Sequence, residues 1–157
     1  MAEQFYKTQK EKIITGEVLD WIFKDVSVKY GLTEFSNVPK KVEIFEKEKG
    51  KFYIHCLKRD KDILVYNKDK NSGAPEEIIR QLWLKKLRDE YKYPMERIEV
   101  EKSIEFGREI KKKAADIVVY KKDKITPYII FEVKNPNGPK AIEQLKSYLN
   151  AEGCEIG

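Results

Sequence analysis

The sequence has 157 residues, of which 41% are hydrophobic and 38% are charged, with a formal net charge of +5; an average globular protein is about one quarter charged, so one domain with an unusually ionic surface is the first expectation. The longest uncharged apolar run, residues 125–131, is too short for the ~20 residues of a membrane span, the first residues lack the apolar core of a signal peptide, and no GxxxxGK(S/T) nucleotide-binding motif occurs. Two distant cysteines and one histidine exclude a zinc finger and a disulfide framework and suit a reducing cytosol, so we expect a cytoplasmic protein without a membrane partner.

The first half of the chain has the pattern of a small antiparallel sheet. Residues 12–25 fit either a helix or a strand that enters a bend. Three later segments, in which apolar and polar residues alternate, predict the strands of an antiparallel meander: 42–46, 51–57 and 63–66. We therefore expect residues 1–74 to form a β-rich extension without recognisable chemistry.

The segment 71–75, Asn-Ser-Gly-Ala-Pro, separates this extension from a second half with a different pattern. Residues 76–90 predict a helix, because apolar residues recur at three- and four-residue spacing, and Glu76 and Glu77 occupy its first turn, where the helix dipole favours acidic groups. Three strands, a helix and the start of a fourth strand follow: 98–106, 114–120, 127–133, 140–150 and 154–157. Residues 75–157 thus predict an α/β core (α+β, mixed sheet) in the order helix, three strands, helix, strand.

Two of these strands carry a carboxylate inside an apolar run. Asp116 lies in Ala-Ala-Asp-Ile-Val-Val-Tyr, and Glu132 lies in Tyr-Ile-Ile-Phe-Glu-Val-Lys. An unpaired buried carboxylate is costly, so each requires a cation, hydrogen-bond donors or a raised pKa. These two residues are therefore candidates for a functional site.

A hairpin centred on Lys124 brings the two carboxylates together. Facing residues then have numbers that sum to 248, so Asp116 faces Glu132, Tyr120 faces Tyr128 and Ala114 faces Lys134. Asp116, Glu132 and Lys134 share one face of the sheet, where two carboxylates suit an oxygen-liganded cation such as Mg²⁺. The alternative is a plain Glu132–Lys134 ion pair, with Asp116 as a polar strand end.

These residues resemble a known nuclease signature. Asp116 followed by Glu132-Val133-Lys134 resembles the D…ExK motif of the PD-(D/E)xK nuclease superfamily. Glu77, or Glu76, is similar to the acidic residue that this superfamily places on its first helix, and Gln144 with Tyr148 matches its QxxxY element. Together with Pro75 and Arg80-Gln81, these motifs make residues 75–157 resemble the N-terminal nuclease domain of the R subunit of type I restriction enzymes, and residues 1–74 resemble the extension of such subunits.

The resemblance implies a restriction-endonuclease-like core and a Mg²⁺-dependent endodeoxyribonuclease without base readout of its own. It implies that Asp116, Glu132 and the carbonyl of Val133 hold the metal, that Lys134 orients water or stabilises charge, and that Glu77 assists. Gln144 and Tyr148 would position DNA or brace the site. The implied partners are double-stranded DNA, the modification and specificity subunits and the motor domains of a longer chain, which alone use ATP; we expect this chain to be a fragment that stops at Gly157 inside the core.

Several residues also have purely structural interpretations. Tyr148 fits the packing stripe of an amphipathic helix, and Glu76 and Glu77 fit simple complementation of the helix dipole. Two lysine clusters that flank the strand 114–120 could meet a phosphate backbone or protect strand ends: Lys111, Lys112 and Lys113 before it, and Lys121 and Lys122 after it. At the level of the whole chain, the alternatives are a catalytically idle DNA- or subunit-binding module of the same fold, and an unrelated α/β domain in which the motif is accidental.

Overall fold

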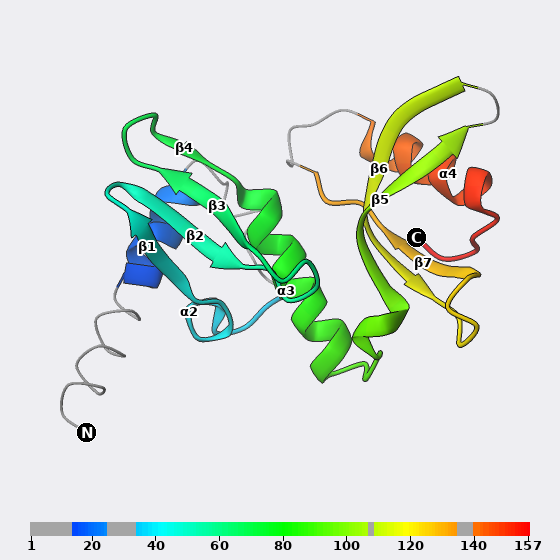
Figure 1. The fold of residues 1–157 in the computed structure, drawn as a ribbon, viewed down its shortest axis with the longest axis horizontal. Coiled ribbons are helices and arrows are strands. Elements are labelled where there is room, and N and C mark those ends of the chain that lie inside the picture. Colours follow the sequence, from blue (N-terminus) through cyan, green and yellow to red (C-terminus); the bar gives the residue numbers. More distant parts are fainter. Residues whose placement is uncertain (1–13, 25–33, 107–108, 135–139) are drawn as a thin grey trace. The chain divides into compact units, whose positions relative to one another are not determined.

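The computed structural model in Figure 1 describes residues 14–24, 34–106, 109–134 and 140–157. The chain divides into two compact units, Met1–Lys85 and Lys86–Gly157. The described residues form helices and two antiparallel sheets, one of four strands and one of three. The mixed α+β class expected from the sequence is therefore confirmed. No described helix combines the length and the apolar composition that a membrane crossing requires.

The first unit is a four-stranded antiparallel meander with helices. A helix covers residues 14–22, so the helical interpretation of 12–25 is confirmed for those residues and the strand alternative is wrong there; residues 12, 13 and 25 lie outside the described part. The other elements are α2 (Val38–Lys41), β1 (Ile44–Glu48), β2 (Lys51–His55), β3 (Asp62–Asn67), β4 (Ser72–Gly73) and the first part of α3 (Pro75–Asp89). The strand order β1-β2-β3-β4 confirms the meander.

Two short elements of this unit were not predicted. Helix α2 has Pro39 in its first turn, and β4 pairs with β3 through Tyr66–Gly73 and Asn67–Ser72. Segment 71–75 was interpreted as a separator, whereas its Ser72 and Gly73 form the edge strand of the sheet. Elements of two and four residues are too short to show a periodic pattern, and only tertiary pairing reveals them.

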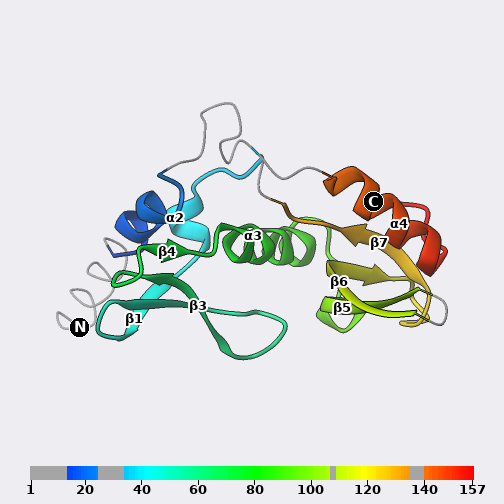
Figure 2. The same cartoon turned by 90° about the horizontal axis from the view of Figure 1, so that it is seen from above.

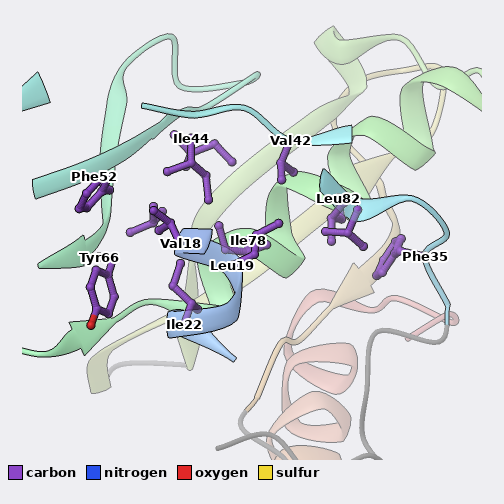
Figure 3. Packing of buried hydrophobic residues seen from close by; sticks show 13 residues of the cluster. Val18, Leu19, Ile22, Phe35, Val42, Ile44, Phe52, Tyr66, Ile78 and Leu82 are labelled. Carbon is purple, nitrogen blue, oxygen red and sulfur yellow. The ribbon is translucent and has the colours of Figure 1, made fainter. Parts of the chain in front are cut away.

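The core of the first unit lies between the sheet and its helices (Figure 3). Alternation places every second strand residue on one face, and that face carries the buried Ile44, Phe52 and Ile54. Val18, Leu19 and Ile22 from the helix 14–22 and Ile78 and Leu82 from α3 belong to the same cluster. A fully buried side chain of this kind stabilises the fold by about 1.5–3 kcal/mol, so this cluster holds the start of α3 against the sheet.

The second unit consists of a three-stranded sheet and a helix. Its elements are the end of α3, the 3-10 helix η2 (Met95–Arg97), β5 (Ile98–Phe106), β6 (Glu109–Tyr120), β7 (Pro127–Phe131) and α4 (Ala141–Glu152). The sheet order is β5-β6-β7, and α4 packs against β5 and β7 (Figure 2). Ile156 forms a parallel bridge with Ile129, at the position where the sequence predicts the start of a fourth strand.

The predicted hairpin register is confirmed over three residue pairs and wrong at the turn. Ile117 pairs with Phe131, Val118 with Ile130 and Val119 with Ile129, so their numbers sum to 248. Tyr120 pairs with Pro127 rather than with Tyr128, because the register shifts after Val119. The turn closes through a bond from the N–H of Lys121 to the carbonyl of Thr126 at 2.8 Å, which shortens the loop on the β7 side.

In the second sheet, the start of β6 and the end of β7 also differ from the predictions. Strand β6 begins at Glu109, so Lys111, Lys112 and Lys113 lie inside the strand and not ahead of it. Strand β7 ends at Phe131, so Glu132 and Lys134 lie just beyond the ladder. The charged segments at these two boundaries lack the alternation of apolar and polar residues from which the strand ends were predicted. The true ends depend on backbone hydrogen bonds to the neighbouring strand, which the sequence of one strand does not reveal.

Candidate active site

Asp116 is the buried polar residue of the central strand β6. Only 8% of its surface is exposed, and its Oδ2 accepts a hydrogen bond from the backbone N–H of Val133 at 2.8 Å. The ladder between β6 and β7 ends at the pair Ile117–Phe131, so the predicted Asp116–Glu132 pair lies one residue beyond it. The side chain of Asp116 thus binds the backbone where β7 has ended, and it fixes the position of the segment 132–134.

Glu132 lies within this segment, and its side chain is 2% exposed. Its Oε1 accepts hydrogen bonds from Lys134 Nζ at 2.7 Å and from Gln144 Nε2 at 2.8 Å. The same Gln144 nitrogen lies 2.6 Å from the hydroxyl oxygen of Tyr148. Gln144 and Tyr148 are four residues apart and therefore neighbours on one face of α4, so the helix presents both to Glu132.

The charges of this cluster act on one another. The pKa of Lys134 is raised, first by its hydrogen bond to Glu132 and then by the charges of Glu132 and Asp116. Burial is the main cause that raises the pKa of Tyr148, and the charges of Glu132 and Asp116 raise it further. Both carboxylates therefore act on the same lysine and the same tyrosine. The structure brings together Asp116, Glu132, Val133, Lys134, Gln144 and Tyr148.

Tyr148 fits both interpretations of the sequence, as a core residue of α4 and as a member of the polar cluster around Glu132. Its side chain is 0% exposed and belongs to the core cluster of the second unit, against which Leu145 and Leu149 pack. Its hydroxyl group meanwhile contacts Gln144. The packing stripe predicted for α4 is confirmed, and the polar end of the same side chain reaches the acidic cluster.

Glu77 lies in the first unit, on the first turn of α3, and has partners of its own there. Its carboxylate accepts hydrogen bonds from Arg59 and Arg80, and from Gln81 Nε2 at 2.9 Å. The side chain is 7% exposed. Arg80 follows Glu77 by three residues, a spacing that places both side chains on the same face of α3. The partners within this unit make Glu77 a link between α3 and the turn after β2.

Sequence reasoning missed the contribution of that turn. Arg59 Nε donates to Cys56 Sγ at 3.1 Å, and Gln81 Oε1 accepts the N–H of Leu57 at 3.1 Å. The i+3 and i+4 spacing of Arg80 and Gln81 from Glu77 was a usable signal, whereas Arg59 stands 18 residues from Glu77 and no local pattern connects them.

The metal-binding side chains of the described residues determine whether the cluster can hold a metal ion. No group of three or more His, Cys, Asp and Glu side chains among them is arranged to hold one. Asp116 and Glu132 provide two carboxylates, and the remaining oxygen of the predicted set is the backbone carbonyl of Val133. Oxygen donors of this type are those that Mg²⁺ prefers, so the donor chemistry of the cluster fits this ion.

The predicted DNA-contacting lysines 111–113 lie in β6, and the side chain of Lys113 is exposed.

Residues 75–157 match the protein family described as "Type I restriction enzyme R protein N terminus (HSDR_N)". Searches of curated proteins and of solved structures found no match. The family match spans Asp116, Glu132, Lys134, Gln144 and Tyr148, as well as the start of α3.

Proposed function

The chain belongs to the family of type I restriction enzyme R protein N-termini, and from this premise we propose that it is a Mg²⁺-dependent endonuclease region that hydrolyses DNA phosphodiester bonds. The observation that carries the proposal is the convergence of two carboxylates on one lysine: Glu132 binds Lys134 at 2.7 Å, and the charge of Asp116 acts on the same ammonium group. The order of α3, β5, β6, β7 and α4 is consistent with the restriction-endonuclease-like core that we propose for residues 75–157, after an extension formed by residues 1–74.

In this proposal, Asp116 and Glu132, with the carbonyl of Val133, hold the metal. A bound Mg²⁺ supplies charge neutralisation at the phosphoryl group and lowers the pKa of a coordinated water. The chain's own contribution is to keep the donors in place. Asp116 is anchored by the N–H of Val133, and Glu132 by Gln144, so both carboxylates are oriented before DNA arrives.

Lys134 is the residue that we propose to act on the reacting phosphate. Its side chain is 40% exposed, whereas that of its partner Glu132 is 2% exposed, so the ammonium group reaches both the buried carboxylate and solvent. Its raised pKa keeps it protonated at neutral pH. A fixed positive charge at this position orients an attacking water or stabilises the negative charge that builds up on the phosphate oxygens.

The remaining predicted residues have supporting roles in the proposal. Gln144 and Tyr148 brace Glu132 or position DNA, and the lysines 111–113 contact the phosphate backbone. Glu77 is the helix carboxylate of the family pattern, chosen over the half-buried Glu76 because it is the buried member of the pair. Its bonds to Arg59 and Arg80 support a role in positioning α3.

The proposed partners follow from the family. An R subunit acts on double-stranded DNA together with modification and specificity subunits, and we propose that sequence choice comes from these partners and that ATP is used by motor domains outside this chain. We propose a cytoplasmic location, which the two free, buried cysteines, Cys56 and Cys154, support. The alternative is a catalytically idle DNA- or subunit-binding module of the same fold.

Cleavage of DNA by the assembled enzyme tests the proposal. The R subunit that carries Asp116→Asn or Lys134→Ala, assembled with its partner subunits, should lose at least about 10²–10³-fold in cleavage rate, with ATP hydrolysis retained. The control is Glu143→Ala, which changes an exposed residue of α4 and should leave both rates unchanged. Cleavage by either site variant at the wild-type rate would show that the assigned site is wrong; a wild-type complex that binds DNA without cutting it would favour the idle module.

A further inference from the structure

The turn between β6 and β7 (Figure 1) consists of residues 121–126, all of which are exposed. It contains three lysines and one aspartate in four consecutive residues, Lys121 to Lys124, and all of them are exposed. Ile125 follows them and is 79% exposed, the largest value among the exposed large hydrophobic residues of the described chain. The turn thus combines positive charge with an apolar tip.

The turn is held in shape by its own hydrogen bonds. Asp123 Oδ1 accepts the N–H groups of Ile125 and Thr126, both at 2.9 Å, and Asp123 Oδ2 accepts the hydroxyl of Thr126 at 2.5 Å. The Thr126 hydroxyl is the main cause that lowers the pKa of Asp123 to about 2, and the two backbone N–H groups lower it further. The carboxylate of Asp123 therefore binds backbone and hydroxyl groups of the turn, and its charge also acts on Lys121.

The lysines of the turn differ in their contacts. Lys124 forms an ion pair with Glu96 at 3.2 Å, in which both side chains are more than half exposed; such a surface pair is worth little. Lys121 and Lys122 form no ion pair within the described part of the chain. Because these two ammonium groups form no ion pair there, they are available to bind the phosphate oxygens of a nucleic-acid backbone. Such binding is driven by charge attraction and by the release of counterions from the nucleic acid.

The position of the turn relative to the candidate active site fits the same partner. Turn and site lie at opposite ends of β7, which begins at Pro127 and is followed by Glu132. Five residues of strand span about 17 Å, and the rise of duplex DNA is about 3.4 Å per base pair along each strand. In a duplex that lies along β7, the phosphate next to the turn would therefore be about five base pairs, or half a helical turn, away from the phosphate next to Asp116 and Glu132.

We propose that the turn 121–126 is a second contact with the DNA duplex, in which Lys121 and Lys122 bind phosphates and Ile125 contacts the apolar sugar edge of the groove. The contact reads no bases. It holds the duplex along β7, so that the phosphate backbone is presented to the site at the other end of the strand. This inference rests on the proposed nuclease function and extends it by a specific contact surface.

The test is the salt dependence of DNA binding by the 157-residue chain. Binding to a fluorescent 30-base-pair duplex is measured by anisotropy over a range of salt concentrations in EDTA, where no cleavage occurs. Each lost lysine–phosphate contact reduces the slope of log K against log salt by about 1, so Lys121→Ala with Lys122→Ala should reduce it by about 2 for any duplex sequence. Ile125→Ser should weaken binding without a change of slope.

The matched control is Lys40→Ala with Lys49→Ala, two exposed lysines of the first unit, which should leave the slope unchanged. An unchanged slope and affinity in the turn variant, an equal loss in the control, or no DNA binding by the wild-type chain would each overturn the turn contact. The cleavage assay with Asp116→Asn remains an independent test of the nuclease function, because it requires no residue of the turn.

Discussion

The two units each bury carboxylates, and they compensate the charge in opposite ways. In the first unit, one carboxylate, Glu77, is bound by two guanidinium groups, Arg59 and Arg80. In the second unit, two carboxylates, Asp116 and Glu132, act on one ammonium group, Lys134. In the first arrangement two cations surround one acid and join elements of the fold, whereas in the second two acids act on one lysine, which leaves an excess of negative charge there.

The two clusters also differ in the groups that contact their carboxylates. Glu77 is contacted by long side chains from its own helix and from the turn after β2, so it connects elements of the fold. Asp116 accepts a backbone N–H, and Glu132 accepts an amide N–H from Gln144 beside its ion pair with Lys134, so neutral donors orient both carboxylates. We therefore expect changes at the two clusters to differ in their effect on stability.

The largest effect is expected from Glu77→Gln. The substitution leaves two arginines in a buried position next to a neutral amide, and removal of one partner of a buried ion pair typically costs about 3–5 kcal/mol. The free energy of unfolding, measured by urea denaturation, should fall by this amount. Glu76→Gln changes the half-buried neighbour in the same helical turn and should stay within about 0.5 kcal/mol; equal effects of the two substitutions would remove the distinction between the clusters.

A smaller loss is expected from Gln144→Ala. Its amide nitrogen contacts both Glu132 and Tyr148, and a hydrogen bond to a charged group contributes about 1.5–3 kcal/mol. Urea denaturation should show a loss in this range, whereas Glu143→Ala, at the exposed neighbouring position, should show none. A double-mutant cycle with Tyr148→Phe should give a coupling energy above about 0.5 kcal/mol; strict additivity would mean that the three residues do not act together.

Asp116→Asn should change stability by less than about 1 kcal/mol, and towards greater stability in EDTA. The asparagine oxygen still accepts the N–H of Val133, while one of two neighbouring negative charges is removed. In a protein of this size, 1 kcal/mol corresponds to about 2–4 °C in Tm. A thermal melt that shows a loss comparable with that of Glu77→Gln would mean that Asp116 is a structural residue.

The smallest effect concerns the exposed His55 of the first unit. Its Nδ1 lies 2.9 Å from Asp62 and its Nε2 lies 3.0 Å from Asp60, and these bonds, that to Asp62 first, raise its pKa above the ordinary 6.5. The folded state therefore gains stability that is fully present below pH 6.5 and is lost as the pH rises through the raised pKa. An NMR titration should show a lower His55 pKa in Asp62→Asn and no change in Asp69→Asn; equal values in all three proteins would contradict the contacts.

Much of the fold was predictable because it depends on local periodicity. The helical spacing of residues 76–90 and the alternation in the first sheet are confirmed, and the register sum of 248 holds from Ile117 to Val119. The shift at Tyr120 was not predictable, since it follows from hydrogen bonds inside the turn. The extension of β6 back to Glu109 depends on pairing with β5 and not on its own sequence.

The candidate site was predictable where motif spacing and hairpin register agree. Glu132 contacts Lys134 and Gln144. These contacts were predictable because the ExK motif follows the hairpin and the QxxxY motif lies on the next helix. The bond from Val133 to Asp116 arises because β7 ends one residue before the predicted facing pair. The link between Glu77 and Arg59 joins segments without any shared sequence pattern, so only the folded structure reveals it.

The most direct test of the account is the location of a bound divalent cation. Crystals of the protein soaked in Mn²⁺, a visible substitute for Mg²⁺, should show an anomalous peak with oxygen ligands from Asp116 and Glu132 at about 2.0–2.6 Å, and this peak should be lost in Asp116→Asn. A well-ordered structure at saturating Mn²⁺ without a peak between these two carboxylates would contradict the assignment of a metal-dependent nuclease site to this chain.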